Sequence, residues 1–421
     1  MRSTSGGRRR GVAALVVGLA AALALAACSG SSDKGDKAAN DPGGSGSDST
    51  SSSSTSSKPT PTKPAGPAVS VAVTPAASAP VNPLTPIVVK ASDGTLANVV
   101  VTNKKTQRVV QGGYDAGRST WRSSEVLGYG KAYNVAVTAK DKDGKVLRKS
   151  SSLSVINPPV AYPNVVPPPG ATDIGVGMPL AVRFGSPVKA VKDRAAIQKG
   201  LTVTSTPAQQ GAWYWLSDTE VDYRPANYWQ AGTKLTLNIK VYGKDLGGGI
   251  YGETDRTIDY TVHDSWVAKA DGNTEHMDIF HNGVFTKRMN ISMGKQETPT
   301  HLGIHVISDK HNPYIMDSCT YGVCQGDPNY YRSTEYYAER ISDDGEFVHE
   351  NPNSVSAQGS TNVSHGCINL NEADAAWFYA HFNVGDVVEV TNSGGPPLPL
   401  TDRIGVWSVP WAEWSAGNAG A

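Results

Sequence analysis

Cys367 is the residue of this chain whose sequence neighbourhood is best suited to chemistry. It lies in the segment SHGCIN at 364–369, and His349 precedes it at the end of the segment GEFVH at 345–349. A thiol becomes a strong nucleophile when an imidazole takes its proton, because a thiolate–imidazolium pair then forms. Main-chain N–H groups at a turn that Gly366 permits can hold the oxyanion formed when the thiolate attacks a carbonyl. This spacing predicts acyl transfer through a cysteine.

The cysteine count and the N-terminus together favour a free thiol at position 367. The chain has 421 residues and four cysteines. Three arginines at 8–10 precede an apolar run at 11–27, which is typical of an export signal. The run ends in LAAC, which resembles a bacterial lipobox, so we predict cleavage before Cys28 and lipidation of its thiol. An uncleaved membrane anchor is the alternative and gives the same topology. In an oxidising compartment Cys319 and Cys324 could form a disulfide, which leaves Cys367 unpaired.

Composition narrows the classes of partner. Lys and Arg number 38 and Asp and Glu also number 38, so the chain has no net positive field with which to attract nucleic acid. A hydrophobic content of 39% at this length fits two to four globular domains. We therefore expect no nucleic-acid partner, and any membrane contact should come from the N-terminal lipid.

The segments before the candidate site are predicted to be mainly strands. Residues 1–27 form the signal peptide, and residues 28–66 are Ser-, Thr- and Pro-rich and predict a disordered linker. Short alternating apolar runs over 67–158 predict a β-sandwich. A Gly turn followed by a period-two strand at 130–139 recurs 102 residues later at 232–241, which predicts a second module over 159–264. We interpret both as immunoglobulin-like, and two β-rich segments without a shared plan are the alternative.

The region at 265–394 is predicted to carry the catalytic residues. Asn282 and Gly283 predict a type I′ hairpin turn. Asn371 is suited to cap a short helix that ends before Gly385. A helix that begins just after Cys367 would also favour a thiolate through its dipole.

The tail at 395–421 contains three tryptophans. Trp407, Trp411 and Trp414 have the spacing of one face of a helix. We expect these tryptophans to pack the tail back onto the protein. Stacking of the indoles on a sugar is the more specific alternative.

The order His349, fourteen residues, SHGC at 364–367 and then Asn369 resembles the signature of L,D-transpeptidases of the YkuD type, which cross-link peptidoglycan. The chain is similar to the mycobacterial-type enzyme, which has a lipobox-like N-terminus, two immunoglobulin-like domains and a wrapped C-terminal segment. The resemblance extends to several further segments, at 292–295, 316–318, 320–323, 357–359, 377–379 and 411–419. It implies a mainly β fold with two immunoglobulin-like β-sandwiches, followed by a β-rich YkuD-type catalytic domain with a short helix after the cysteine.

The resemblance also implies roles for individual residues. Cys367 would be the nucleophile and His349 the general base, with the main-chain N–H groups of His365, Gly366 and Cys367 as the oxyanion hole. The residues expected to contact substrate are Tyr331, Met316, Asp344, Gly345, Asn369 and Ser364. Met316 would begin, and Tyr331 would lie on, a flap that covers the site.

The function implied is formation of 3-3 cross-links between peptidoglycan stems. Cys367 would attack the third residue of a donor tetrapeptide, release D-Ala and hold a thioester until the side-chain amine of an acceptor stem attacks. Carbapenems are the expected inhibitors, and no cofactor or metal is expected. The alternatives are an L,D-carboxypeptidase with water as acceptor, or a non-catalytic cell-wall-binding protein. The predicted location is the outer face of the cytoplasmic membrane, held by a lipid on Cys28.

The chain departs from the family pattern at the candidate site. Glu350 replaces the Ser that often follows the catalytic His, and its carboxylate could raise the pKa of His349. Asn353 replaces a usual Trp, which predicts a less apolar pocket wall. The cysteines at 319 and 324 predict a stiffened flap.

Two candidate metal sites in the sequence carry no prediction of an ion. His301 and His305 have the spacing of zinc ligands on a helix, but on an extended strand they would lie about 13 Å apart. The loop near Asp245 resembles one where relatives hold calcium, but Gly248 stands where a Glu is expected, so the ion is not among our predictions.

Overall fold

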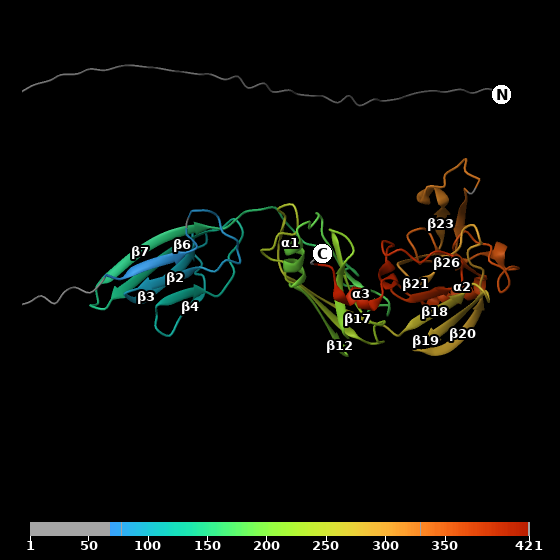
Figure 1. The fold of residues 1–421 in the computed structure, drawn as a ribbon, viewed down its shortest axis with the longest axis horizontal. Helices are drawn as coiled ribbons and strands as arrows, with labels where there is room; N and C mark the ends of the chain where they lie inside the picture. The colour runs from blue at the N-terminus through green and yellow to red at the C-terminus, as the bar shows by residue number, and fades with distance from the viewer. Residues whose placement is uncertain (1–67, 77, 329, 420–421) are drawn as a thin grey trace, which may run out of the picture. The chain divides into compact units, whose positions relative to one another are not determined.

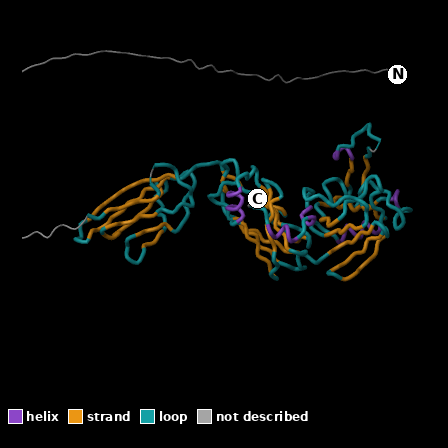
Figure 2. Tube along the Cα trace, in the orientation of Figure 1, coloured by secondary structure: helices purple, strands orange, loops and turns teal. Residues whose placement is uncertain are grey.

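The structure is a computed structural model, and it describes residues 68–76, 78–328 and 330–419. The predicted signal peptide, the lipidation site at Cys28 and the linker at 28–66 lie outside these residues. Within them, no helix has the length and apolar character needed to cross a bilayer. Strands predominate, as Figure 2 shows in orange, which confirms the predicted fold class.

The first β-sandwich is built from two sheets that share one apolar core. Ile87, Trp121 and Val135 are among its buried side chains, and they come from both sheets or the segments beside them. In sheet order the strands are β1 (Ser70–Thr74), β2 (Val88–Ser92), β5 (Thr120–Ser123) and β4 (Gly112–Tyr114), and then β3 (Gly94–Asn103), β6 (Ala132–Asp141) and β7 (Val146–Ser154).

The second β-sandwich has its own core. Trp213 and Trp215 lie two residues apart on one strand and are both buried in it. Its first sheet runs β10 (Asp173–Ile174), β17 (Arg256–Val262), β15 (Lys234–Ile239) and β12 (Leu201–Thr206), and its second runs β13 (Gly211–Trp215), β14 (Glu220–Pro225), β11 (Leu180–Arg183) and β9 (Asn164–Val166). The remaining elements are α1 (Val191–Gln198) and the short parallel pair β8 (Val160–Ala161) and β16 (Tyr251–Gly252).

The repeat found in the sequence has a counterpart in the fold. Gly130 and Gly232 both adopt positive φ, at 62° and 77°, two residues before β6 and β15 respectively. Each of these strands has a hydrogen-bonded neighbour on both sides in its sheet. A glycine at this position lets the chain turn sharply into a buried strand whose alternate side chains enter the core.

The third region contains a five-stranded sheet, a four-stranded sheet and a projecting hairpin (Figure 1). Asn282 and Gly283 have φ values of 50° and 77°, which confirms the predicted hairpin turn between β19 and β20. The sheets are β20 (Val284–Asn290), β19 (His276–His281), β18 (Trp266–Asp271), β28 (Val387–Thr391) and β21 (Gly303–Val306), and then β22 (Asp309–His311), β25 (Ala338–Arg340), β26 (Phe347–Glu350) and β27 (Ile368–Leu370). The hairpin is β23 (Tyr314–Asp317) and β24 (Arg332–Glu335), and η1 (Ser318–Tyr321) and η2 (Pro352–Ser354) are short 3-10 turns.

Helix α2 (Glu372–His381) packs behind the two strands that will matter for chemistry. The Asn371 side chain accepts a hydrogen bond from Asp374 N–H, as predicted for its cap. Phe378 is fully buried in one core with Val348 of β26 and Ile368 of β27. The helix therefore fixes the inner faces of these strands, and alternation turns their other faces toward the site.

The C-terminal tail packs on the second sandwich. It contains η3 (Gly405–Ser408) and α3 (Trp411–Ala416), so the helix includes only two of the three tryptophans. Trp414 is fully buried, and its indole N–H donates to Ala212 O at 2.9 Å. Arg224 of β14 lies among the three indoles, with its guanidinium carbon 4.6 Å from the ring centres of Trp407 and Trp414.

Candidate active site

Strands β26 and β27 bring the nucleophile and the base together. They pair in parallel, with Val348 opposite Ile368 and His349 opposite Asn369. Because Val348 and Ile368 enter the core, His349, Cys367 and Asn369 face the other way, into a pocket of about 310 Å³. Cys367 is 7% exposed and is the free cysteine among those that the structure describes. The imidazole of His349 lines the same pocket and lies close enough to the Cys367 thiol for the thiol to raise its pKa.

The turn that carries Cys367 is held by the segment 292–300. Ser364 N–H donates to Met293 O at 3.0 Å, and Thr300 Oγ1 donates to Gly366 O at 2.8 Å. Gly366 has φ 130°, a conformation that only glycine adopts without strain. The Ser364 hydroxyl donates to Cys367 O at 2.6 Å and accepts from Gly366 N–H at 3.1 Å. Ser364 lines the pocket, but its hydroxyl is used to shape the turn.

These bonds change the expected oxyanion hole. The predicted donors were three main-chain N–H groups, but that of Gly366 is occupied by the Ser364 hydroxyl. The N–H groups of His365 and Cys367 are the remaining candidates. The predicted contribution of a helix dipole to the thiolate is wrong, because β27 separates Cys367 from the start of α2 and the dipole acts only near the first turn.

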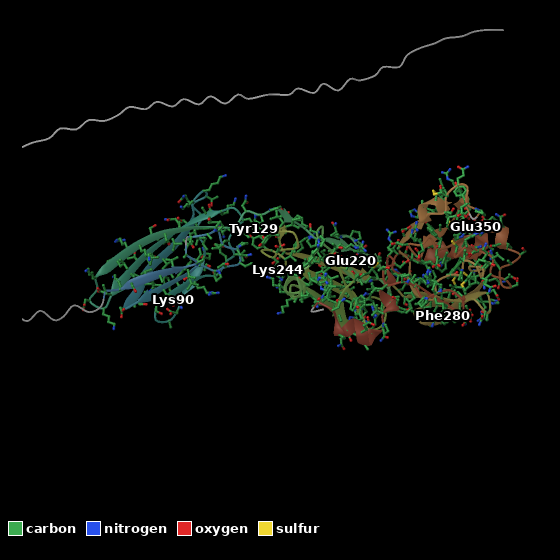
Figure 3. The ribbon with its side chains drawn as sticks, turned by 45° about the horizontal axis from the view of Figure 1, so that its top comes forward. Lys90, Tyr129, Glu220, Lys244, Phe280 and Glu350 are labelled. Carbon is green, nitrogen blue, oxygen red and sulfur yellow. A yellow bond between two sulfur atoms is a disulfide. The ribbon has the colours of Figure 1, made fainter. Side chains whose placement is uncertain are left out.

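His349 is buried, at 3% exposure, and is oriented through Nδ1. This nitrogen donates to Glu350 O at 2.6 Å, so the main chain of Glu350, which Figure 3 labels, orients the imidazole. Nδ1 also lies 3.3 Å from Glu335 Oε2. Burial lowers the pKa of His349, but the hydrogen bonds to Cys367 and Glu335 outweigh it and raise the pKa to about 10. The imidazolium form of His349 is therefore favoured at neutral pH.

The predicted effect of the Glu350 carboxylate is thereby corrected. The carboxylate that raises the pKa of His349 belongs to Glu335, which sequence analysis missed. Glu350 has its own pKa raised by burial and by the neighbouring carboxylates of Glu372 and Glu335.

The hairpin β23–β24 forms one wall of the pocket and projects from the third region as an orange flap in Figure 1. Met316 is 2% exposed and clusters with Phe347 and Cys367. The Tyr331 ring stacks on His365, with ring centres 5.4 Å apart. Burial, and then the charge of Lys295, lower the pKa of His365, which favours a neutral ring that shapes the site.

A disulfide joins Cys319 and Cys324 at the tip of the flap. Cys319 lies in η1, where its main-chain N–H donates to the Asp317 side chain, and Cys324 follows three residues after that turn ends. The Ser318 hydroxyl donates to Val323 O at 2.8 Å across the same turn. The tip is thus closed both covalently and by hydrogen bonds.

The opposite wall of the pocket is polar. Asn351 and Asn353 line it, and Asn353 stands at the position where the resemblance implies a Trp. Asn369 is 1% exposed, and its Oδ1 has no hydrogen-bond partner in the described part of the chain. A buried amide oxygen that faces a pocket is suited to accept an N–H from a bound peptide.

Asp344 and Gly345 lie beside the pocket and not along its lining. Gly345 O is 3.6 Å from Cys367 Sγ, so its main chain contacts the nucleophile. The Asp344 side chain is 66% exposed, and its Oδ2 lies 3.9 Å from His301 Nε2.

The expectation that His301 and His305 lie on an extended strand is wrong. His305 Nε2 hydrogen-bonds His301 O at 2.9 Å, which requires a bent chain, and Gly303 between them has φ 119°. Both imidazoles reach the buried carboxylate of Glu346, at 2.9 Å and 3.8 Å. Among the described residues, no group of three or more His, Cys, Asp or Glu side chains is arranged to hold a metal.

Comparison with known proteins agrees with this geometry. Residues 265–390 match the family described as L,D-transpeptidase catalytic domain (YkuD), and residues 78–245 match a bacterial Ig domain. The chain is 40% identical over 336 residues to L,D-transpeptidase 2 of Mycobacterium tuberculosis (strain CDC 1551 / Oshkosh), which covers 80% of this chain and 81% of that protein.

Two further relatives were found. L,D-transpeptidase 5 of Mycobacterium tuberculosis (strain ATCC 25618 / H37Rv) is 32% identical over 361 residues, covering 84% of this chain and 78% of that protein. A structure of the L,D-transpeptidase LdtMt1 in complex with imipenem is 31% identical, with a TM-score of 0.48 over 56% of this chain and 99% of that chain. The identity and coverage of the first relative establish that this chain belongs to the L,D-transpeptidase family and is an enzyme with a YkuD catalytic domain.

Proposed function

We propose that this enzyme forms 3-3 cross-links in peptidoglycan through a thioester on Cys367. The thiolate attacks the carbonyl carbon at the third residue of a donor tetrapeptide, and a C–S bond forms. The bond to D-Ala then breaks, and the leaving amine takes a proton from the His349 imidazolium. The side-chain amine of an acceptor stem attacks the thioester and gives a proton to His349. The thiolate is released and the pair is restored.

The observation that carries this proposal is the placement of Cys367 and His349 by the paired strands β26 and β27 in one pocket. Two features of the pocket suit a peptide. Asn369 Oδ1 offers a buried acceptor, and His365 and Cys367, whose main-chain N–H groups would hold the oxyanion, line the pocket. The intact pair weighs against a purely wall-binding protein.

The test is incubation of the protein, residues 28–421, with disaccharide-tetrapeptide and analysis of the products by mass. We expect cross-linked dimers and released D-Ala, and none from a Cys367→Ala variant. Tripeptide monomer without dimers would identify an L,D-carboxypeptidase instead. Dimers from Cys367→Ala would refute the role of the thiol.

We propose that carbapenems inhibit the enzyme by acylating Cys367. The strained lactam carbonyl of a carbapenem is an acyl donor for the same thiolate, and the same N–H groups would hold its oxyanion. Intact-protein mass should increase by one inhibitor, and Cys367→Ala should show no increase.

We propose that the mature protein is anchored by a lipid on Cys28 to the outer face of the membrane. The apolar run that ends in Ala27-Cys28 supports this location. Between the anchor and the enzyme, the two immunoglobulin-like modules would act as a spacer. The first contacts the second through tyrosines, with the Tyr242 hydroxyl donating to Leu127 O at 2.5 Å. A Cys28→Ala variant should lose the lipid and leave the membrane fraction.

A further inference from the structure

Glu335 places a nearly buried carboxylate beside the imidazole of His349. It is the last residue of β24, and its Oε2 lies 3.3 Å from His349 Nδ1. The two side chains are 14% and 4% exposed. An ion pair so little exposed to water is screened far less than a surface pair. The Glu335 carboxylate therefore interacts strongly with the charge on the imidazole. Cys367, His349 and Glu335 are arranged like the three members of a catalytic triad.

The two groups on Nδ1 have different chemical properties. The Glu350 carbonyl, at 2.6 Å, is neutral and fixes the proton on Nδ1, which leaves Nε2 for the thiol. A carboxylate does the same and also stabilises the positive charge that the ring acquires. We propose that Glu335 is a positioning residue that holds His349 through Nδ1 and stabilises the imidazolium formed when Cys367 loses its proton. This inference rests on the proposed role of the pair in acyl transfer.

The surrounding charges support an ionised Glu335. Burial raises the pKa of Glu335, but hydrogen bonds with His349 and Ser333 outweigh burial and lower it below its ordinary value. The other carboxylates that face this region are Glu350 and Glu372, which line a recess of about 380 Å³ together with Glu335. The pKa of Glu350 is raised by burial and by these two neighbours. Glu335 is therefore the carboxylate best placed to carry its charge beside the imidazole.

The position of Glu335 in the chain links the flap to the base. Strand β24 pairs with β23, with Tyr314 opposite Glu335 and Met316 opposite Ser333. Glu335 thus belongs to the same hairpin as the pocket wall, while His349 belongs to β26. Its carboxylate ties the base of the flap to the catalytic strand.

The first experiment measures kcat/KM for D-Ala release as a function of pH. Glu335→Gln retains the size of the side chain and an acceptor but removes the charge, and Glu335→Asp keeps the charge. The titratable groups near His349 are Cys367, Glu335 and Glu350. In Glu335→Gln the alkaline limb should move to lower pH by about one unit or more, and the rate at pH 7 should fall about tenfold.

Two comparisons make the result specific. Glu335→Asp should recover part of the rate and of the pH profile. The matched control is Glu372→Gln, which removes a carboxylate from the same recess without a contact to His349. It should follow the wild type. If the alkaline limb moves equally in Glu372→Gln and Glu335→Gln, the effect comes from the total negative charge of the recess and not from Glu335. That result would overturn the proposal.

A second measurement separates this inference from the proposed function. In a Cys367→Ala background, His349 is titrated by NMR of its Cε1–H, with and without Glu335→Gln. The pKa of His349 should be lower in the double variant, whether or not the wild type processes peptide. If the two titrations agree within about 0.2 units, Glu335 does not position His349, even if the wild type forms cross-links.

Discussion

Arg224 and His349 are both buried and charged, yet the regions around them differ in how the charge is satisfied. Arg224 is 2% exposed, and its guanidinium donates to three main-chain carbonyls, those of Pro225, Val406 and Val409. Indole rings of the tail surround it. His349 has Nδ1 held by acceptors, and its imidazole shares a pocket with the Cys367 thiol.

The difference separates a structural charge from a chemical one. A buried cation whose three nitrogens each donate to a main-chain carbonyl, as Arg224 does, holds two segments of the chain together. Burial lowers the pKa of Arg224 to about 10, so it still carries its charge at neutral pH. In the pocket, the partner of the charge is a reactive atom that a substrate can reach. Neighbouring Asn369 also keeps an unpaired oxygen, within the described residues. The following changes should separate the two regions.

The largest effect is expected from His349→Gln. Removal of the base should lower kcat/KM for D-Ala release about 10³-fold, because general acid–base catalysis contributes about 10²- to 10⁴-fold. The variant should remain folded, with a lower melting temperature because the little-exposed Glu335 carboxylate loses its charged partner. Release of D-Ala at the wild-type rate would show that His349 is as structural as Arg224.

Arg224→Met should lower the stability of the protein and leave its activity unchanged. Three carbonyls lose their donor and three indoles lose a cation, so the free energy of unfolding should fall by about 3 kcal/mol. Denaturant titration measures this loss, and a parallel assay should give a kcat/KM close to the wild type at 25 °C. A large loss of activity in protein that is still folded would contradict the separation of the two regions.

The next largest effect is expected from pH, which should change the state of His349 in the pocket. The pKa of His349 is raised to about 10, so the imidazolium is present below that pH and is lost as pH rises through it. Acylation should therefore decline about tenfold per unit above pH 10, because the leaving amine loses its acid. The contribution of His349 to the stability of the fold should also decrease as pH rises. The stabilisation from this pair is complete below the unfolded pKa of about 6.5 and disappears as pH rises through 10.

The smallest effect is expected at the flap tip. Replacing Cys319 and Cys324 together by Ser removes a short cross-link, which would constrain the open flap by about 2 kcal/mol at most. Because the hydrogen bonds of the tip remain, we expect KM for the donor to rise about threefold with little change in kcat. Treatment of the wild type with a reductant, followed by steady-state assay, should reproduce this. A change confined to kcat would point to the chemistry at Cys367 instead.

Local rules predicted much of the fold and the reacting pair. The Asn282-Gly283 turn, the Asn371 cap and the two Gly turns before β6 and β15 follow from backbone preferences of a few residues. The pair of His349 and Cys367 follows from a motif in which one residue lies in a strand and the other directly precedes its parallel neighbour.

Contacts between segments distant in sequence were not predictable in this way. Glu335 reaches His349 only because β24 folds back over β26, and nothing in its neighbourhood marks a catalytic partner. His301 and His305 meet one carboxylate because the chain bends at Gly303, which the strand pattern hid. The Gly366 N–H was lost as an oxyanion donor because a hydroxyl two residues away competes for it.

The most direct test of the account is to trap the acyl-enzyme. Wild-type protein is mixed with disaccharide-tetrapeptide without acceptor, quenched in acid, and its intact mass and tryptic peptides are measured. We expect one disaccharide-tripeptide per molecule, located on the peptide that contains Cys367, with one D-Ala released for each adduct. Release of D-Ala without an adduct on Cys367, in samples quenched across the whole time course, would contradict it.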